Sequence, residues 1–390
     1  MKRIFYFALF CLMFGFAFLP TNSAKFVCYA ENEQESLLLA ENAKSAYLIE
    51  KETNTVLFSK NENENLPIAS MTKMMSLSVI FDAINDGKLK LEDKVTVSEN
   101  AAKTEGSQAF LDAGASYSVS DLIKTIVISS ANDSTVALSE KVAGNEKIFA
   151  TLMNKKAKEL NLNNSSFKNS TGLPEDGHYS SAKDCAIIYK SIIDNPIYLK
   201  FANIWMDKLV HPSGRETELV NTNRLVKTYQ GCTSGKTGYT SEAGYCLTTS
   251  ATRAGTTLIG VVIGEKDSKV RFSEVKEMLD YGFANFKTNL FLNSKENKQM
   301  VKVNGGKKEN LEACLKEDYY VFSKINQMPE LNVNYVINNV SAPVKVGDKV
   351  GTAIITNKDG VVLKEIDIVS REEVKKQTLL DVISKISNKW

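Results

Sequence analysis

Strand-forming segments stand at both ends of a long helical region, and this arrangement restricts the possible fold more than any other feature. Ala46–Ile49 and Val56–Phe58 enclose a turn-rich stretch and predict one β-hairpin. Tyr245–Ser250 and Thr257–Ile263 predict a second hairpin far along the chain. The simplest packing joins both ends in one antiparallel sheet and places helices against it. The predicted fold class is therefore α+β, an antiparallel sheet flanked by helices.

The region between the hairpins has the spacing of buried helices. From Ser70 to about residue 199, apolar residues recur at steps of three and four, as in Met74, Leu77, Ile80, Phe81 and Ile84. A further helix, predicted over Val275–Phe286, closes this main domain, which we expect to span residues 31–286.

A second unit follows, rich in Val, Ile, Lys and Asn. Residues 288–370 predict a small C-terminal all-β domain, with a hairpin turn at Asn357–Gly360. Residues 371–390 predict an amphipathic C-terminal helix, whose apolar stripe contains Leu379, Ile383, Ile386 and Trp390. This tail is expected to contact a membrane surface, although such a stripe could instead pack on the β-domain.

The N-terminus has the pattern of a secretory signal peptide, predicted over residues 1–30. Lys2 and Arg3 precede an apolar run that ends at Pro20, too short for a membrane span. Cleavage after Ala30 fits small-residue preferences better than cleavage after Ala24. The alternative is an uncleaved anchor. In both cases the chain is expected to work outside the cytoplasm, on the outer face of the cell membrane.

Composition excludes several classes of function. The 48 Lys+Arg and 46 Asp+Glu residues leave a net charge of +2, which gives no bulk electrostatic reason to expect a nucleic-acid partner. His178 and His211 are the chain's two histidines, so a zinc site with several His ligands is not expected, and no cofactor or metal is predicted. A Ser-His-Asp hydrolase would have to use one of these two; a different base is more consistent with the composition.

The cysteine pattern does not predict a disulfide framework. Cys11 and Cys28 fall in the signal segment, and the remaining spacings are irregular. Most of the others are expected to be free, with a Cys232–Cys246 bridge as the alternative; the four are Cys185, Cys232, Cys246 and Cys314.

Three short motifs carry candidate chemistry. In Ser70-Met-Thr-Lys73, a serine at a helix start has a lysine one turn further on the same face. A desolvated Lys73 would lose its proton more easily and could take the proton of Ser70. The same Ser-x-x-Lys pattern occurs at Ser165, Ser180 and Ser273, where a helix cap with a solvated lysine is the simpler interpretation.

The other two motifs follow in order along the chain. Ser130-Ala-Asn132 comes after an apolar helical stretch, and Lys236-Thr-Gly238 precedes a strand. A lysine and a threonine at a strand edge can hold a carboxylate, and the glycine lets a substrate backbone lie against the strand. Each motif alone is weak and is usually a turn or cap, but the ordered set is typical of penicillin-recognising acyl-transfer enzymes.

At these motifs the chain resembles the D-alanyl-D-alanine carboxypeptidases among the low-molecular-mass penicillin-binding proteins. Pro67–Met75, Phe167–Leu173, Asn221–Leu225 and Gly235–Cys246 are similar to segments of that family, and the similarity covers roughly residues 45–286. The resemblance implies a β-lactamase/transpeptidase-like fold and a serine peptidase that removes the terminal D-alanine from peptidoglycan stem pentapeptides and so limits cross-linking. It also implies covalent inhibition by β-lactam antibiotics.

The resemblance further implies residue roles. Ser70 would be the acyl-ester nucleophile, Lys73 its proton acceptor and Ser130 the proton relay to the leaving amine. The substrate would be bound by Asn132, Lys236, Thr237, Gly238 and Tyr239, with the backbone N–H groups of Ser70 and Tyr239 as the oxyanion hole. Thr171 stands where some members carry histidine, and His178 is given no catalytic role.

Three other functions use the same motifs. One is a transpeptidase, since an amine competes with water for the same acyl-enzyme. A class A-like β-lactamase would need a glutamate to activate water, and Glu159 stands in a matching string. Glu159 is more simply a solvated residue of a charged helix, and a lactamase would not need the β-domain and tail. A non-catalytic wall-binding or β-lactam-sensing protein is the other alternative, but none of the expected catalytic residues is missing.

Overall fold

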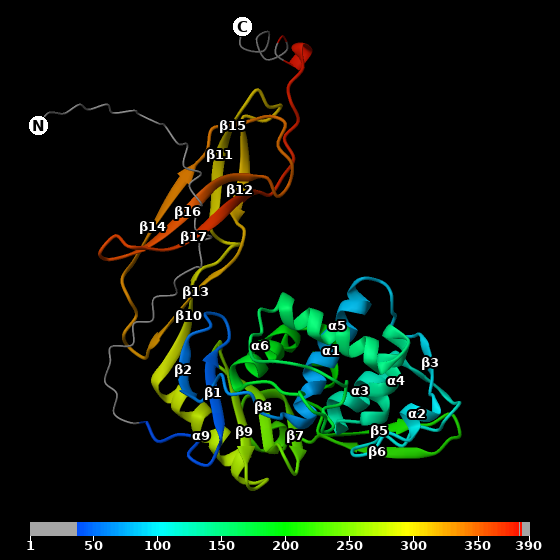
Figure 1. Cartoon of the computed structure of the whole chain (residues 1–390). Coiled ribbons are helices and arrows are strands. Elements are labelled where there is room, and N and C mark those ends of the chain that lie inside the picture. The colour runs from blue at the N-terminus through cyan, green and yellow to red at the C-terminus, as the bar shows by residue number, and fades with distance from the viewer. Residues whose placement is uncertain (1–36, 382, 384–390) are drawn as a thin grey trace, which may run out of the picture.

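The protein has a larger α+β domain and an elongated β-domain, followed by a short C-terminal tail (Figure 1). The computed structural model describes residues 37–381 and 383. The predicted signal segment, with Cys11 and Cys28, lies outside the described residues. Among these residues no helix is long and apolar enough to cross a membrane.

One antiparallel sheet forms the centre of the larger domain, in the strand order β2-β1-β9-β8-β7. Its strands are β1 (Ser45–Glu50), β2 (Val56–Lys60), β7 (Cys232–Thr240), β8 (Gly244–Arg253) and β9 (Thr256–Glu265). The register pairs Ala46 with Val262, so the N-terminal hairpin joins the late strands directly. This confirms the predicted sheet built from both ends of the domain.

The helices cover both faces of this sheet. α1 is almost wholly buried among α4, α5 and α6 on one face, and α9 covers the other. Their bounds are η1 (Ala69–Thr72), α1 (Lys73–Asn85), α2 (Glu99–Ala102), α3 (Val119–Ser129), α4 (Asn132–Ala143), α5 (Glu146–Glu159), α6 (Ala182–Ile193), α7 (Pro196–Ala202), α8 (Leu225–Thr228) and α9 (Val270–Asn285).

Alternation along β1 explains why both faces are covered. Tyr47 and Ile49 join the core under α1, whereas Leu48 joins the core under α9, because neighbouring side chains of a strand point to opposite faces. Gly282 lets α9 approach the sheet closely, since a Cβ atom there would lie 2.4 Å from Leu258. Two small hairpins complete the domain, β3 (Lys94–Thr96) with β4 (Ser116–Ser118) and β5 (Met206–Val210) with β6 (Glu216–Val220).

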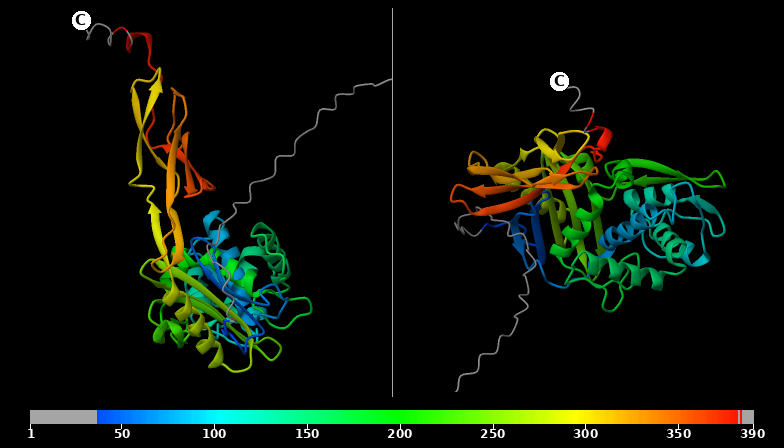
Figure 2. Two further views of the ribbon diagram at one scale, coloured as in Figure 1. Left: turned by 90° about the vertical axis from the view of Figure 1, so that its left-hand side faces the viewer. Right: turned by 90° about the horizontal axis from the view of Figure 1, so that it is seen from above.

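The β-domain extends away from the larger domain, as Figures 1 and 2 show. It has its own core, which includes Val301, Leu311, Ile355 and Ile368. A two-stranded ribbon pairs β10 (Phe286–Leu292) with β13 (Tyr319–Lys324). A six-stranded sheet follows the order β14 (Leu331–Ile337), β16 (Lys349–Asn357), β17 (Val362–Ser370), β12 (Asn310–Leu315), β11 (Lys298–Asn304) and β15 (Val340–Ser341). The predicted β-domain is confirmed, including the turn that joins β16 to β17.

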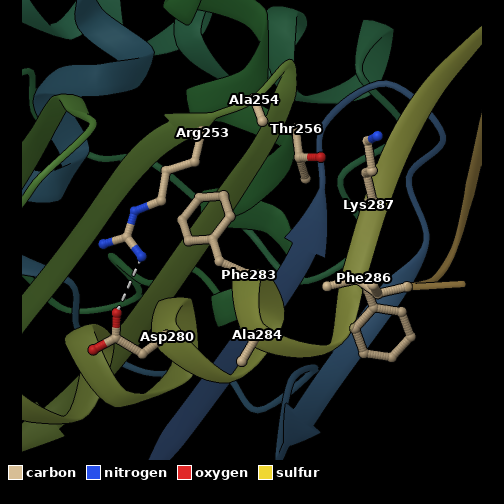
Figure 3. Close-up of a pocket in the computed structure, with 9 residues that line it drawn as sticks. Arg253, Ala254, Thr256, Asp280, Phe283, Ala284, Phe286 and Lys287 are labelled. Atoms are coloured by element: carbon tan, nitrogen blue, oxygen red, sulfur yellow. Dashed lines mark hydrogen bonds and ion pairs between the residues drawn. The ribbon is translucent and has the colours of Figure 1, made fainter.

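Polar contacts join the two domains where α9 runs directly into β10. Thr288 donates its backbone N–H to Thr256 Oγ1 (2.7 Å) and its hydroxyl to Glu50 Oε1 (3.0 Å). Beside them is a pocket of about 490 Å³, in which Arg253 lies over the Phe283 ring and pairs with Asp280 at 3.5 Å (Figure 3). The base of the β-domain is therefore fixed to both the first and the last strand pair of the larger domain.

The tail corrects one sequence expectation. Residues 371–378 are not helical, because Val374 is buried in the β-domain core and pairs with Val344, and Lys376 pairs with Gly306. Helical residues begin at Leu379, where Thr378 and Asp381 cap the helix start by mutual hydrogen bonds. Leu379 and Ile383 are exposed, while the predicted stripe residues Ile386 and Trp390 lie outside the described residues.

Candidate active site

The first motif places a serine and a lysine in direct contact. Ser70 lies in the 3-10 turn η1, and Lys73 begins α1. Lys73 Nζ donates to Ser70 Oγ at 2.7 Å and to the Thr171 carbonyl at 2.8 Å. Burial lowers the pKa of the fully buried Lys73 to about 7, although the carboxylates of Asp133 and Glu146 oppose this shift. A substantial fraction of the amine is therefore neutral near pH 7 and able to accept a proton.

The second and third motifs meet each other. Ser130 follows α3 with a left-handed backbone, φ +63°, which is uncommon for a residue with a side chain. Lys236 Nζ, from β7, donates to Ser130 Oγ at 2.7 Å and to the Thr237 carbonyl at 2.8 Å. Burial and then the positive charges of Lys73 and Arg271 hold the pKa of Lys236 well below its usual range. An anionic ligand beside Lys236 would stabilise its charged form.

Asn132 presents a free acceptor. Its Nδ2 donates to the Glu105 carbonyl at 2.5 Å, whereas its buried Oδ1 has no hydrogen-bond partner among the residues that the structure describes. A buried unpaired acceptor costs free energy unless a ligand supplies a donor. A substrate N–H group would satisfy it.

These side chains surround one pocket of about 450 Å³. Six of the eight sequence-predicted residues line it, namely Ser70, Ser130, Asn132, Thr237, Gly238 and Tyr239. Lys73 and Lys236 contact the hydroxyls of Ser70 and Ser130 from buried positions. The structure thus brings together the eight residues to which the sequence gave a catalytic or substrate-binding role.

Close backbone approach around Ser70 depends on two glycines. A Cβ atom on Gly238 would lie 2.5 Å from the Ile68 carbonyl oxygen, and one on Gly172 would lie 1.9 Å from the Ala69 carbonyl oxygen. Gly172 also has φ +84°, which favours glycine. β7 and the loop after α5 can therefore both press against the turn that carries the serine.

Sequence reasoning missed Arg271, which also lines the pocket. From α9 it donates to the carbonyls of Gly238 (3.1 Å) and Cys246 (3.4 Å). Its buried Nε has no partner within the described part of the chain. No spacing signal could identify this arginine, because only the packing of α9 against β7 and β8 brings it to the site.

Both histidines lie in other contacts. His178 Nε2 is 2.8 Å from Thr72 Oγ1, and burial lowers its pKa to about 4. His211 bonds to Tyr117 and Thr217. Neither lines the pocket, in agreement with the expectation that a different base serves Ser70.

Glu159 lies away from the pocket, at the end of α5. It pairs with Lys155 at 3.8 Å on the surface, and its side chain is half exposed. This agrees with its interpretation as a solvated helix residue. The four described cysteines are all free, so Cys232 and Cys246 form no bridge. Within the described residues, no three His, Cys, Asp or Glu side chains are grouped to hold a metal ion.

A serine in contact with a fully buried lysine lies beside a second serine–lysine pair, on an antiparallel sheet covered by helices. This combination defines the penicillin-recognising class of serine acyl-transfer hydrolases. Comparisons with known proteins narrow this class. A D-alanyl-D-alanine carboxypeptidase family matches residues 30–267, and the penicillin-binding protein 5 C-terminal domain matches residues 286–376. The chain belongs to the D-alanyl-D-alanine carboxypeptidase family, and it is a serine-type carboxypeptidase, as predicted.

Individual relatives extend over nearly the whole chain. D-alanyl-D-alanine carboxypeptidase DacF of Bacillus subtilis is 42% identical over 354 residues, 90% of this chain and 91% of that one. DacC of Escherichia coli is 34% identical over 87% of this chain and 84% of its own length. The crystal structure of penicillin binding protein 5 from Haemophilus influenzae aligns with a TM-score of 0.70 at 31% identity, covering 86% and 98% of the two chains. The β-lactamase alternative is not favoured.

Proposed function

We propose that Ser70 forms an acyl-enzyme with peptidoglycan stem peptides that end in D-Ala-D-Ala. The observation that carries this proposal is the 2.7 Å contact between Ser70 Oγ and a fully buried Lys73 Nζ. Neutral Lys73 takes the Ser70 proton, and Oγ attacks the carbonyl carbon of the penultimate D-alanine. The backbone N–H groups of Ser70 and Tyr239 stabilise the resulting oxyanion.

Collapse of this intermediate breaks the bond to the terminal D-alanine. Ser130 delivers the proton to the leaving amine, and its contact with Lys236 holds its hydroxyl in the site. Lys236 and Thr237 bind the terminal carboxylate, and Asn132 Oδ1 accepts a peptide N–H. Gly238 lets β7 lie against the turn that carries Ser70, rather than making room for the substrate as expected from the sequence, and Arg271 positions the strand through the Gly238 carbonyl. Water then hydrolyses the ester, so the shortened stem can no longer donate to a cross-link.

The same site explains covalent inhibition by β-lactams. A β-lactam carries an amide carbonyl and a carboxylate in the same relation as the D-Ala-D-Ala end, so it acylates Ser70. The test is to incubate the enzyme with a D-Ala-D-Ala pentapeptide and measure released D-alanine, with Ser70→Ala as the control. Release by Ser70→Ala at the wild-type rate would contradict the carboxypeptidase mechanism. So would wild-type release that stops at one D-alanine per enzyme, because the acyl-enzyme would then not be hydrolysed.

We further propose that the enzyme works outside the cytoplasm and contacts the outer face of the cell membrane through its tail. Leu379 and Leu380 are each 77% exposed, and the tail leaves the β-domain at the end remote from the larger domain (Figure 1). Exposed leucines beside Lys375 and Lys376 suit an interface with anionic lipids.

The membrane contact can be tested by co-sedimentation with anionic liposomes. Because Val374 belongs to the β-domain core, the truncated chain should end at Gln377. We expect the full chain to sediment and the truncated chain to stay in solution with normal D-alanine release. Equal sedimentation of both, or loss of activity on truncation, would contradict the proposal.

A further inference from the structure

The general base has a second contact, and it comes from a loop rather than from the motifs. Lys73 Nζ donates to the Thr171 carbonyl at 2.8 Å in addition to Ser70 Oγ. Thr171 is buried, and the Ser-x-x-Lys spacing does not include it. An ammonium or amine group with two fixed acceptors has a defined orientation, so the position of this carbonyl sets the direction of Lys73.

The loop that carries Thr171 is held by hydrogen bonds on both sides. Asn169 Oδ1 accepts from the Gly172 N–H at 2.8 Å, within the loop itself. Ser76 Oγ donates to the Ser170 carbonyl at 2.6 Å, which ties the loop to α1 one turn after Lys73. These contacts fix the middle of the loop. They provide no acceptor for the backbone N–H and the hydroxyl of Ser170, which bond to a different helix.

Glu146 supplies that element, from the first turn of α5. Its Oε1 accepts from both the Ser170 N–H (2.9 Å) and Ser170 Oγ (2.6 Å). Ser170 is completely buried, so loss of this acceptor would leave two donors unpaired beside the base. The Glu146 carboxylate therefore fixes Ser170, and Ser170 is the neighbour of Thr171, whose carbonyl orients Lys73.

Glu146 also acts on Lys73 through charge. Its carboxylate raises the pKa of Lys73 against the larger effect of burial, in the same direction as Asp133. Asp133 accepts N–H groups of Ala109 and Leu111, so its substitution would also release that loop. Substitution of Glu146 by glutamine, in contrast, keeps an acceptor for Ser170 and removes only the charge.

We propose that Glu146 is a positioning residue for the general base, which acts on Lys73 in two ways, through the Ser170 and Thr171 contacts and through its negative charge. The proposal rests on the proposed role of Lys73. The bland alternative is that Glu146 only stabilises the N-terminus of α5, where an acidic residue is favourable. The two interpretations differ in whether Glu146 affects the proton affinity of Lys73.

The test is the pH dependence of the second-order rate constant for acylation by a penicillin, measured by burst labelling. In Glu146→Gln, Lys73 loses its proton more easily, so the acid limb should move to lower pH by roughly half a unit or more. Glu159→Gln, at the other end of the same helix, is the matched control and should keep the wild-type limb. A folded Glu146→Gln enzyme with an unshifted limb overturns the proposal.

Glu146→Ala tests the geometric half. It removes the acceptor for Ser170, so acylation at the optimal pH should fall by about tenfold or more, and Glu146→Gln should recover most of that loss. Equal acylation by Glu146→Ala and wild type would overturn the positioning role. A failure of the proposed function gives a different result. Normal acylation of Lys73→Ala would show that Lys73 is not the general base, whatever the Glu146 variants do.

Discussion

Glu265 and Glu274 present their carboxyl groups to each other in the seam between β9 and α9. Glu265 is completely buried, and neither of its carboxyl oxygens has a hydrogen-bond partner within the described chain. Burial and the neighbouring carboxylate raise the pKa of Glu265 to about 9. Burial opposes ionisation of Glu274 too, but the neighbouring Glu265 carboxyl group and the hydrogen bonds from Asn42 and Ala43 hold its pKa below its usual value. Near neutral pH Glu265 is therefore protonated, and Glu274 carries the negative charge.

This pair predicts a pH-dependent cost in stability. Because the folded state raises the pKa of Glu265, it binds a proton that the unfolded chain releases above about pH 4.5, so the free energy of unfolding falls from there to about pH 9. Glu265→Gln keeps the size of the side chain and removes its titration. Its stability relative to wild type should rise by roughly 1 kcal/mol per pH unit between pH 5.5 and 8.5 in urea unfolding. The exposed Glu277→Gln should show no such trend.

Acylation should follow the titration of Lys73. With a pKa of about 7, the neutral amine appears as pH rises, so the acylation rate by a penicillin should increase through neutrality and level off above it. Lys73→Arg should abolish this reaction, since an arginine stays charged in the range. Stopped-flow acylation from pH 5.5 to 9 measures the pH profile of the wild type and the activity of Lys73→Arg. Normal turnover by Lys73→Arg would show that another group is the base.

Loss of the Lys236 charge should appear mainly in substrate binding. Lys236→Met should raise KM for the pentapeptide by roughly tenfold or more, and lower kcat less, because the contact with Ser130 is also lost. Lys236→Arg should recover part of the affinity. Steady-state D-alanine release provides both constants, and an unchanged KM in Lys236→Met would remove this residue from carboxylate recognition.

The left-handed backbone of Ser130 predicts that two inactive variants differ in stability. Ser130→Gly and Ser130→Ala both lose the hydroxyl, so acylation should fall by about a hundredfold or more in each. Glycine adopts φ +63° without the steric cost of a Cβ atom, so Ser130→Gly should be more stable than Ser130→Ala by about 1 kcal/mol. Thermal unfolding compares the two directly; equal melting temperatures would contradict this account.

Labelling should identify a single serine. A β-lactam should modify the peptide that contains Ser70, and mass spectrometry after proteolysis should detect one adduct. Ser165 and Ser180, which also begin Ser-x-x-Lys patterns, bond to each other at 2.8 Å away from the pocket. An adduct on either of them, or on Ser273, would contradict the assignment.

Short-range patterns explain what could be predicted. The periodicity of Met74 to Ile84 predicts α1, and the turn at Asn357–Gly360 predicts the hairpin, because each signal lies within one element. The motif order also selects the residues around Ser70. Contacts set by packing could not be predicted: Thr171 reaches Lys73 across 98 positions, and Arg271 reaches Gly238 across 33. The helix predicted over residues 371–390 wrongly included Val374, because local periodicity does not reveal that a residue is buried in the core of the β-domain.

The two glycines pressed against the serine turn also limit how such an enzyme can evolve under antibiotic selection. Any side chain at Gly172 or Gly238 would collide with the backbone just before Ser70 and displace Ser70. Such a change would therefore impair the reaction with the antibiotic and the reaction with the wall peptide together. Resistance that spares wall maintenance must therefore arise where the pocket can change shape without moving the turn. Tyr239 has a side chain 56% exposed at the pocket edge, so this side chain can change while the backbone N–H of Tyr239 stays in the oxyanion hole.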